Sequence, residues 1–136
     1  MAYSLKQGLI TDWETTRRNE RHGFNLVCLL ASLMTLFLLY QFGDAFLMRL
    51  FLIFVFLILT YSLITLFWKI SGHMTANTAF VLVLNVLFDW RFCWLVFLLP
   101  LVAWARMVRN KHDIWQILGG VALSSLVILL GNYALF

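Results

Sequence analysis

Long apolar runs separated by short polar turns are the feature that most limits what this chain can fold into. Of its 136 residues, 63% are hydrophobic and only 12% are charged, whereas ordinary soluble domains are roughly 45–50% apolar. A helix needs about 20 apolar residues to cross the hydrocarbon core of a bilayer. The sequence therefore predicts an all-α protein that spans a membrane.

Five apolar runs follow a polar N-terminal segment. We expect this segment, residues 1–23, to lie at the membrane interface, where Thr11 or Asp12 would cap a short helix. No linker divides the remaining residues, so 24–136 are predicted to form one helical membrane domain. The expected spans are 24–42, 45–68, 74–88, 92–107 and 114–136.

Small residues and a proline indicate how these helices bend and pack. The single proline, Pro100, falls inside the fourth apolar run and predicts a kink there. Gly119, Gly120 and Ser124 would give the fifth helix a face that a neighbouring helix can approach closely. We therefore expect the fifth helix to pack closely against a neighbouring helix.

The basic residues and histidines gather on one side of the predicted membrane. With five spans, that side carries eight of the ten Lys and Arg residues and all three histidines, His22, His73 and His112. Positive charge is enriched in cytoplasmic loops, so this face is predicted to be cytoplasmic. The net charge of +4 is then explained by topology and anionic headgroups, and nucleic acid is not an expected partner.

Two polar turns on this face carry residues suited to phosphate chemistry. The first reads Lys69-Ile70-Ser71-Gly72-His73, and the second contains Arg106 and His112. Cations and backbone N–H groups would neutralise phosphoryl oxygens, with a Ser at a helix start exposing the N–H groups. One histidine would attack phosphorus, and the other would protonate the leaving oxygen. This chemistry needs neither a metal nor another cofactor.

These two turns resemble the type 2 phosphatidic acid phosphatase family, membrane lipid phosphatases with the motifs KxxxxxxRP, PSGH and SRxxxxxHxxxD. The second motif matches at Ser71-Gly72-His73, with Ile70 in place of the proline. The third matches at Arg106 and His112, with Gln116 in place of the aspartate. The first is reduced to Arg21-His22, with Glu14 at the lysine position.

The resemblance implies a role for each matching residue. His112 would be the nucleophile that forms a phosphohistidine, and His73 would be the general acid. The phosphate-binding residues would be Arg106, Ser71 and the backbone of Gly72, with Arg21 as a helper. Lys69 is added to this set for its charge and its position beside the motif. Gln116 would orient His112 by accepting a hydrogen bond, without the negative charge of the family's aspartate.

The expected function is hydrolysis of a phospholipid or isoprenoid phosphate inside the membrane, as a phosphoric monoester or diphosphate hydrolase. Membrane lipids would surround the bundle. The sequence leaves open whether the chain forms a homo-oligomer or binds a partner within a membrane complex.

Two other functions also remain open. One is a catalytically degenerate relative that serves as a small structural subunit, which the incomplete motifs favour. The other is a haem or redox subunit, because His73 and His112 on separate spans could ligate one iron.

Overall fold

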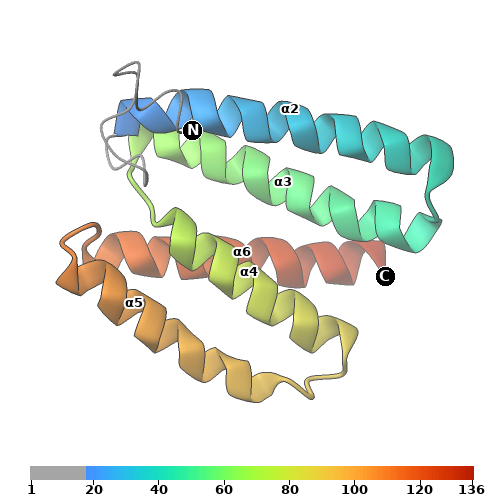
Figure 1. The fold of residues 1–136 in the computed structure, drawn as a ribbon. Helices are drawn as coiled ribbons and strands as arrows, with labels where there is room; N and C mark the ends of the chain where they lie inside the picture. Colours follow the sequence, from blue (N-terminus) through green and yellow to red (C-terminus); the bar gives the residue numbers. More distant parts are fainter. Residues whose placement is uncertain (1–17) are drawn as a thin grey trace.

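The structure, a computed structural model, describes residues 18–136, with side chains from residue 23 onwards. Helices hold 85% of these residues, and no strand occurs among them. The elements are α2 (Arg18–Phe42), α3 (Ala45–Phe67), α4 (Gly72–Leu87), the 3-10 helix η1 (Cys93–Phe97), α5 (Leu98–Val108) and α6 (Ile114–Leu135) (Figure 1). The all-α architecture is confirmed.

Three of the helices are long and apolar enough to cross a membrane. They are Gly23–Phe42 within α2, Ala45–Phe67 and Ile114–Leu135. α4 has 16 residues, which rise about 24 Å at 1.5 Å per residue, somewhat less than the ~30 Å hydrocarbon core. η1 and α5 together form a second short apolar segment. The predicted apolar runs are thus helical, and three of the five have full spanning length.

The N-terminal segment is described only at its end. α2 begins at Arg18, so residues 18–23 form its first turns and the helix starts ahead of the predicted span. The expected caps Thr11 and Asp12, like Glu14, lie outside the described residues. Arg21 belongs to α2, but its side chain also lies outside the description.

Pro100 lies near the start of α5, inside the apolar helical segment Cys93–Val108, and the predicted kink stays a prediction. The chain passes from η1 into α5 at Leu98, which makes Pro100 the third residue of α5. The N–H groups in the first turn of a helix have no intrahelical acceptor, so the N–H that proline lacks is not missed there.

Short polar side chains begin three of the helices. Asp44 Oδ1 accepts a hydrogen bond from Leu47 N at 2.8 Å, and Asp113 Oδ1 accepts one from Gln116 N at 2.8 Å. Ser71 Oγ accepts from Met74 N at 3.4 Å. Such N-caps satisfy amide groups that the first turn leaves open, so these residues fix where α3, α6 and α4 begin.

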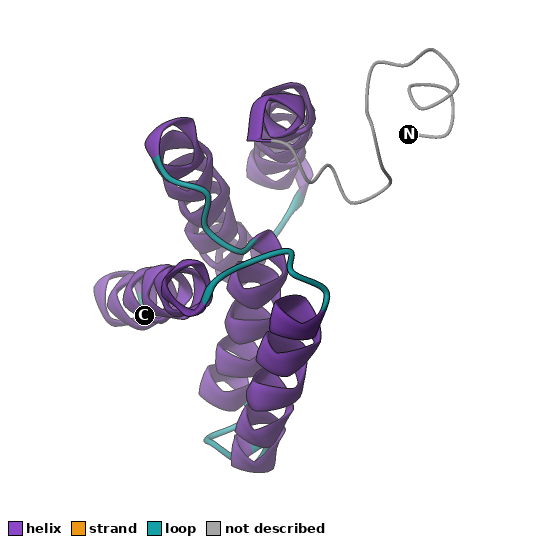
Figure 2. Ribbon diagram, turned by 90° about the vertical axis from the view of Figure 1, so that its left-hand side faces the viewer, coloured by secondary structure: helices purple, strands orange, loops and turns teal. Residues whose placement is uncertain are grey.

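Two helical hairpins are joined through α6. α2 packs on α3, α5 packs mainly on α4, and α6 contacts both α3 and α4. Seen along the helices, the pair α2–α3 stands apart from the pair α4–α5, with α6 beside both (Figure 2). The buried core is formed by α3, α4 and α6 and consists of Ile53, Leu57, Ala79, Val127 and Ile128.

The contact between α4 and α6 is close because small residues line it. A Cβ added to Gly120 would lie 2.8 Å from Ser71 O and 3.1 Å from Thr75 Oγ1. One turn later, the fully buried Ser124 donates its hydroxyl to Thr75 O at 2.7 Å. A Cβ on Gly119 would meet the Trp68 ring at 2.7 Å. The predicted small-residue face of α6 is confirmed.

Replacing Gly120 by alanine should destabilise the fold by about 1–3 kcal/mol, as overpacking of a filled interface does. Gly23 is the matched control, because it is also helical and a Cβ there would meet nothing within 4 Å. Gly23→Ala should leave stability unchanged or raise it by up to about 1 kcal/mol. Unfolding in detergent micelles measures both, and equal stabilities would contradict the close α4–α6 contact.

Candidate phosphate site

The turn between α5 and α6 is shaped by the end of α5. Asn110 N donates to Met107 O at 2.8 Å, and Lys111 N donates to Arg106 O at 3.1 Å. Asn110 adopts a φ of 51°, the left-handed conformation that asparagine tolerates better than most residues. This pair of bonds is the Schellman ending of a helix, and it turns the chain so that His112 comes directly before the cap of α6.

His112 is held by Gln116 inside this turn. Its Nδ1 lies 2.8 Å from Gln116 Oε1, and the side chain is only 7% exposed. An amide oxygen can only accept, so Nδ1 carries the proton and donates it. The lone pair of the neutral ring is then on Nε2. Gln116 therefore occupies the orienting position that the sequence suggested, without adding negative charge.

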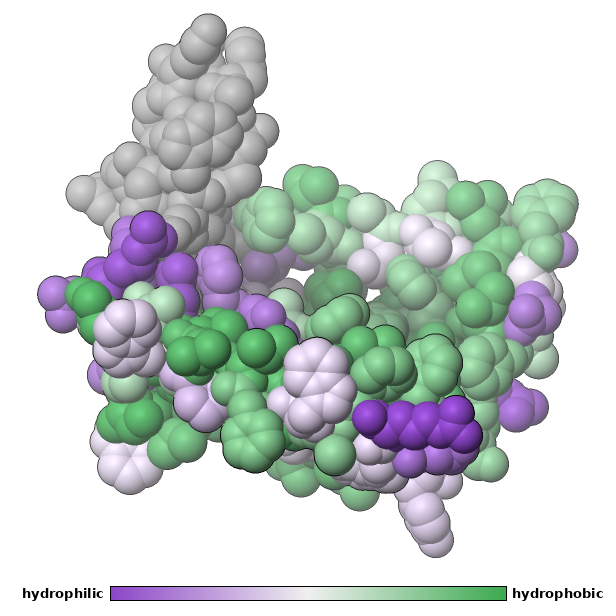
Figure 3. All heavy atoms as spheres, turned by 60° about the horizontal axis from the view of Figure 1, so that its bottom comes forward, coloured by the Kyte–Doolittle hydropathy of each residue, from purple (hydrophilic) through white to green (hydrophobic). Residues whose placement is uncertain are grey.

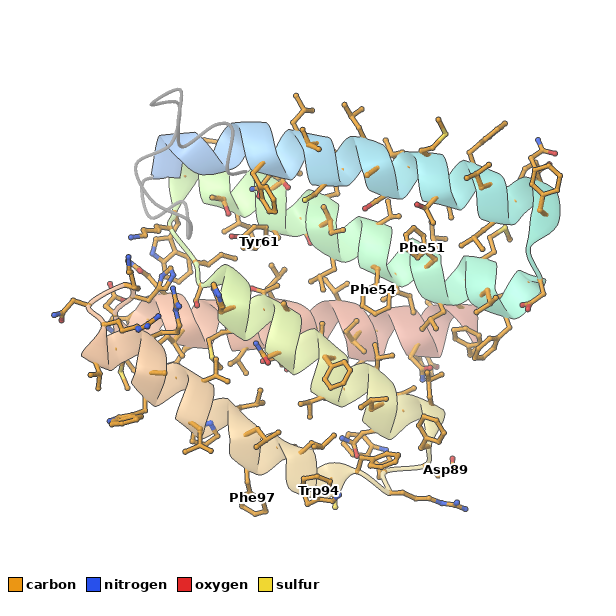
Figure 4. All side chains as sticks on the ribbon, viewed as in Figure 1. Phe51, Phe54, Tyr61, Asp89, Trp94 and Phe97 are labelled. Carbon is orange, nitrogen blue, oxygen red and sulfur yellow. The ribbon has the colours of Figure 1, made fainter. Side chains whose placement is uncertain are left out.

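A polar pocket of about 290 Å³ surrounds this pair. Its lining residues are Lys69, Asn110, Lys111, His112, Asp113 and Gln116. Two lysines and one aspartate give the lining a formal charge of +1 when His112 is neutral. The pocket lies at the end of the bundle where hydrophilic side chains gather, at the left of Figure 3, and where side-chain nitrogens cluster in Figure 4. We call it the His112 pocket.

The backbone of Ser71 links the start of α4 to Gln116 beside the pocket, and the Ser71 side chain is buried. Ser71 N donates to Gln116 O at 3.0 Å, so the first turns of α4 and α6 are tied together. The residue is 0% exposed, and its hydroxyl accepts the α4 capping bond from Met74 N. In this structure the Ser71 hydroxyl serves the helix start.

Gly72 lies against Tyr61, a residue that the sequence analysis did not single out. A Cβ on Gly72 would lie 2.8 Å from the Tyr61 hydroxyl oxygen, so a larger residue there would displace this ring, which is labelled on α3 in Figure 4. His73 follows as the second residue of α4 and is exposed. It belongs to the same end of the bundle but does not line the His112 pocket.

Arg106 lies in the last turn of α5, where a cation interacts favourably with the helix dipole. It is 7% exposed and is not among the residues that line the pocket. The structure thus gathers Lys69, His112 and Gln116 around one space. It adds Asn110, Lys111 and Asp113, which the sequence reasoning missed. The Asp-x-x-Gln spacing of a helix cap was the signal for Asp113.

Within residues 18–136, no group of three or more His, Cys, Asp or Glu side chains could hold a metal ion. No known family model matches the chain, and neither a curated protein nor a solved structure matches it. The resemblance to the lipid phosphatases is carried by the residues at Ser71 to His73 and at Arg106 to His112.

Replacing Gln116 by leucine should release the His112 ring while keeping a side chain of similar volume. In the wild type, nitrogen NMR of labelled histidine should show His112 protonated at Nδ1. In Gln116→Leu the proton should move largely to Nε2, the usual tautomer of imidazole in water. The exposed His73 is the internal control and should not change. An unaltered His112 tautomer would contradict the 2.8 Å contact to Gln116.

Proposed function

We propose that the chain is a membrane-embedded, metal-independent phosphatase that acts on a phospholipid or isoprenoid phosphate through His112. One observation carries this proposal. A buried histidine has Nδ1 anchored on Gln116 at 2.8 Å, beside a pocket lined by Lys69 and Lys111. An oriented imidazole next to two cations is what nucleophilic attack on a phosphate ester requires.

The proposed reaction begins at Nε2 of His112. Its lone pair forms a bond to phosphorus while the bond from phosphorus to the lipid oxygen breaks, and His73 gives a proton to that oxygen. Water then attacks the phosphohistidine, His73 takes back a proton, and inorganic phosphate leaves with His112 restored. Lys69 and Lys111 would neutralise the phosphoryl oxygens throughout, since cations are worth most where charge develops in the transition state.

The other motif residues take supporting roles in this proposal. The hydrogen bond from Ser71 N to Gln116 O at 3.0 Å supports it, because it ties the helix that carries His73 to the residue that orients His112. The backbone N–H groups at the start of α4 would contribute further donors. Arg106 and Arg21 would add positive charge at the same end of the bundle.

The site would sit at headgroup depth in a five-span protein. In addition to the three long helices, α4 and the η1–α5 segment would cross a locally thinned bilayer, as short spans can. The phosphate of a lipid would then reach the His112 pocket from the membrane surface, with its tail between helices. The excess of basic residues on this side makes the cytoplasm its proposed location.

A structural subunit is the second candidate, and the enclosed Ser71 favours it. Its hydroxyl is 0% exposed and caps α4, so it offers no group to a substrate in this arrangement. Gln116 also lacks the charge that would stabilise a protonated histidine. A chain of this kind would keep the fold of an enzyme and contribute helices to a membrane complex.

Loss of His112 should separate the two candidates. Phosphate release from a short-chain phosphatidic acid in detergent should fall to background in His112→Ala, because the nucleophile is gone. In His73→Ala it should fall by about 10² to 10⁴, the usual contribution of a general acid. Vanadate, which mimics five-coordinate phosphorus, should compete with the substrate. Equal rates in the wild type and His112→Ala, with both proteins folded, would exclude the phosphatase. The structural subunit would then be the remaining candidate.

Gln116→Glu should raise the turnover of an active enzyme. Glutamate has the same length as glutamine, so the contact to His112 Nδ1 is kept while a negative charge is added beside the ring. That charge stabilises the positive imidazole formed in the reaction, as the acidic partner does in histidine-based triads. Gln41→Glu is the control, because it makes the same change at an exposed glutamine near the end of α2 that does not line the pocket. An unchanged rate in Gln116→Glu would mean that another group already supplies the charge.

A further inference from the structure

A second pocket lies at the opposite end of the bundle and is almost entirely apolar. Its volume is about 250 Å³. α3 and α4 each supply three of its lining residues, α6 supplies two, and Phe136 follows the end of α6: Phe46, Leu50, Ile53, Val83, Val86, Leu87, Ile128, Asn132 and Phe136. α3 and α4 diverge from left to right in Figure 1, with α6 between them. The pocket fills this wedge, and α6 forms its floor.

The lining of the pocket is suited to hydrocarbon. α3 and α6 are both long and apolar enough to span a membrane, and Asn132 is the only polar residue in the lining. Large apolar side chains at the rim are well exposed, with Phe46 at 49% and Phe136 at 53%. At about 250 Å³, the pocket holds less than one turn of a helix, which with its side chains is about 10–12 Å across and rises about 5.4 Å per turn. A stretch of hydrocarbon chain fits this volume.

A cation stands at the rim of the same pocket. Arg49 precedes the lining residue Leu50, and its Nη1 donates to Leu135 O at 3.4 Å, next to the lining residue Phe136. The bond holds the exposed guanidinium where α3 and α6 meet. Within residues 18–136, Arg49 forms no ion pair with a carboxylate. A guanidinium has five N–H donors and matches phosphate geometry, so donors remain for a headgroup.

We propose that this pocket binds one anionic phospholipid of the leaflet opposite the His112 pocket, with an acyl chain in the wedge and its phosphate on Arg49. The proposal does not depend on hydrolysis. The pocket supplies the apolar contact, and Arg49 supplies the preference for negative charge. Such a lipid would link α3 to α4, which are connected mainly through their contacts with α6.

The test is native mass spectrometry of the full-length protein in detergent, with phosphatidylglycerol or phosphatidylcholine of the same chains added. We expect one lipid to be retained, with phosphatidylglycerol preferred. Arg49→Gln should lose about tenfold in affinity for phosphatidylglycerol, the usual size for a lost charged hydrogen bond, and Arg49→Lys should keep most of it. Phosphatidylglycerol has no phosphomonoester, and His112→Ala should retain it equally.

Arg91 provides the matched control, because it is an exposed cation in the turn that leads from α4 to η1 at the same end of the bundle. Arg91→Gln should not change the affinity. Val86→Trp, whose larger side chain fills the pocket, should bind neither phosphatidylglycerol nor phosphatidylcholine. Equal losses in Arg49→Gln and Arg91→Gln, or retention of lipid by Val86→Trp, would overturn the proposal. So would a wild-type dimer that Val86→Trp turns into a monomer, because a second copy would then be the occupant.

Discussion

The close contact between α4 and α6 is the constraint on which the rest of the structure depends. In a membrane, helices gain little from the hydrophobic effect, so association relies on close packing and interhelical hydrogen bonds. Gly120 provides the first, because a Cβ there would lie only 2.8 Å from Ser71 O. Ser124 provides the second by donating to Thr75 O at 2.7 Å. Because α6 also packs on α3, the α4–α6 contact holds the two hairpins together.

The same α4–α6 contact brings the residues of the candidate site together. α4 and α6 begin side by side because Ser71 N donates to Gln116 O, and Gln116 in turn holds His112. In this arrangement the Ser71 hydroxyl is buried and caps α4. A residue that the phosphatase motif would assign to phosphate thus serves the helix start. The same few contacts position His112 and bury the Ser71 hydroxyl.

The two ends of the bundle differ in character because their helix ends meet differently. At one end, the turns 68–71 and 109–113 fold over the start of α6 and leave a pocket lined by polar groups. At the other end, α3 and α4 diverge over α6, and apolar side chains line the gap. The first pocket is therefore polar and the second is almost entirely apolar.

The sequence by itself determined the helices and most of their ends, because run length and caps are local properties. The apolar runs, Ser71 before α4, and Gly120 with Ser124 in α6 required no knowledge of the fold. The sequence did not reveal the 3-10 helix η1 ahead of Pro100, since this segment has no clear pattern. Only the tertiary structure decided which side chains share a pocket. The left-handed turn at Asn110, the Tyr61 ring over Gly72 and the burial of Ser71 all arise from packing between segments distant in the chain.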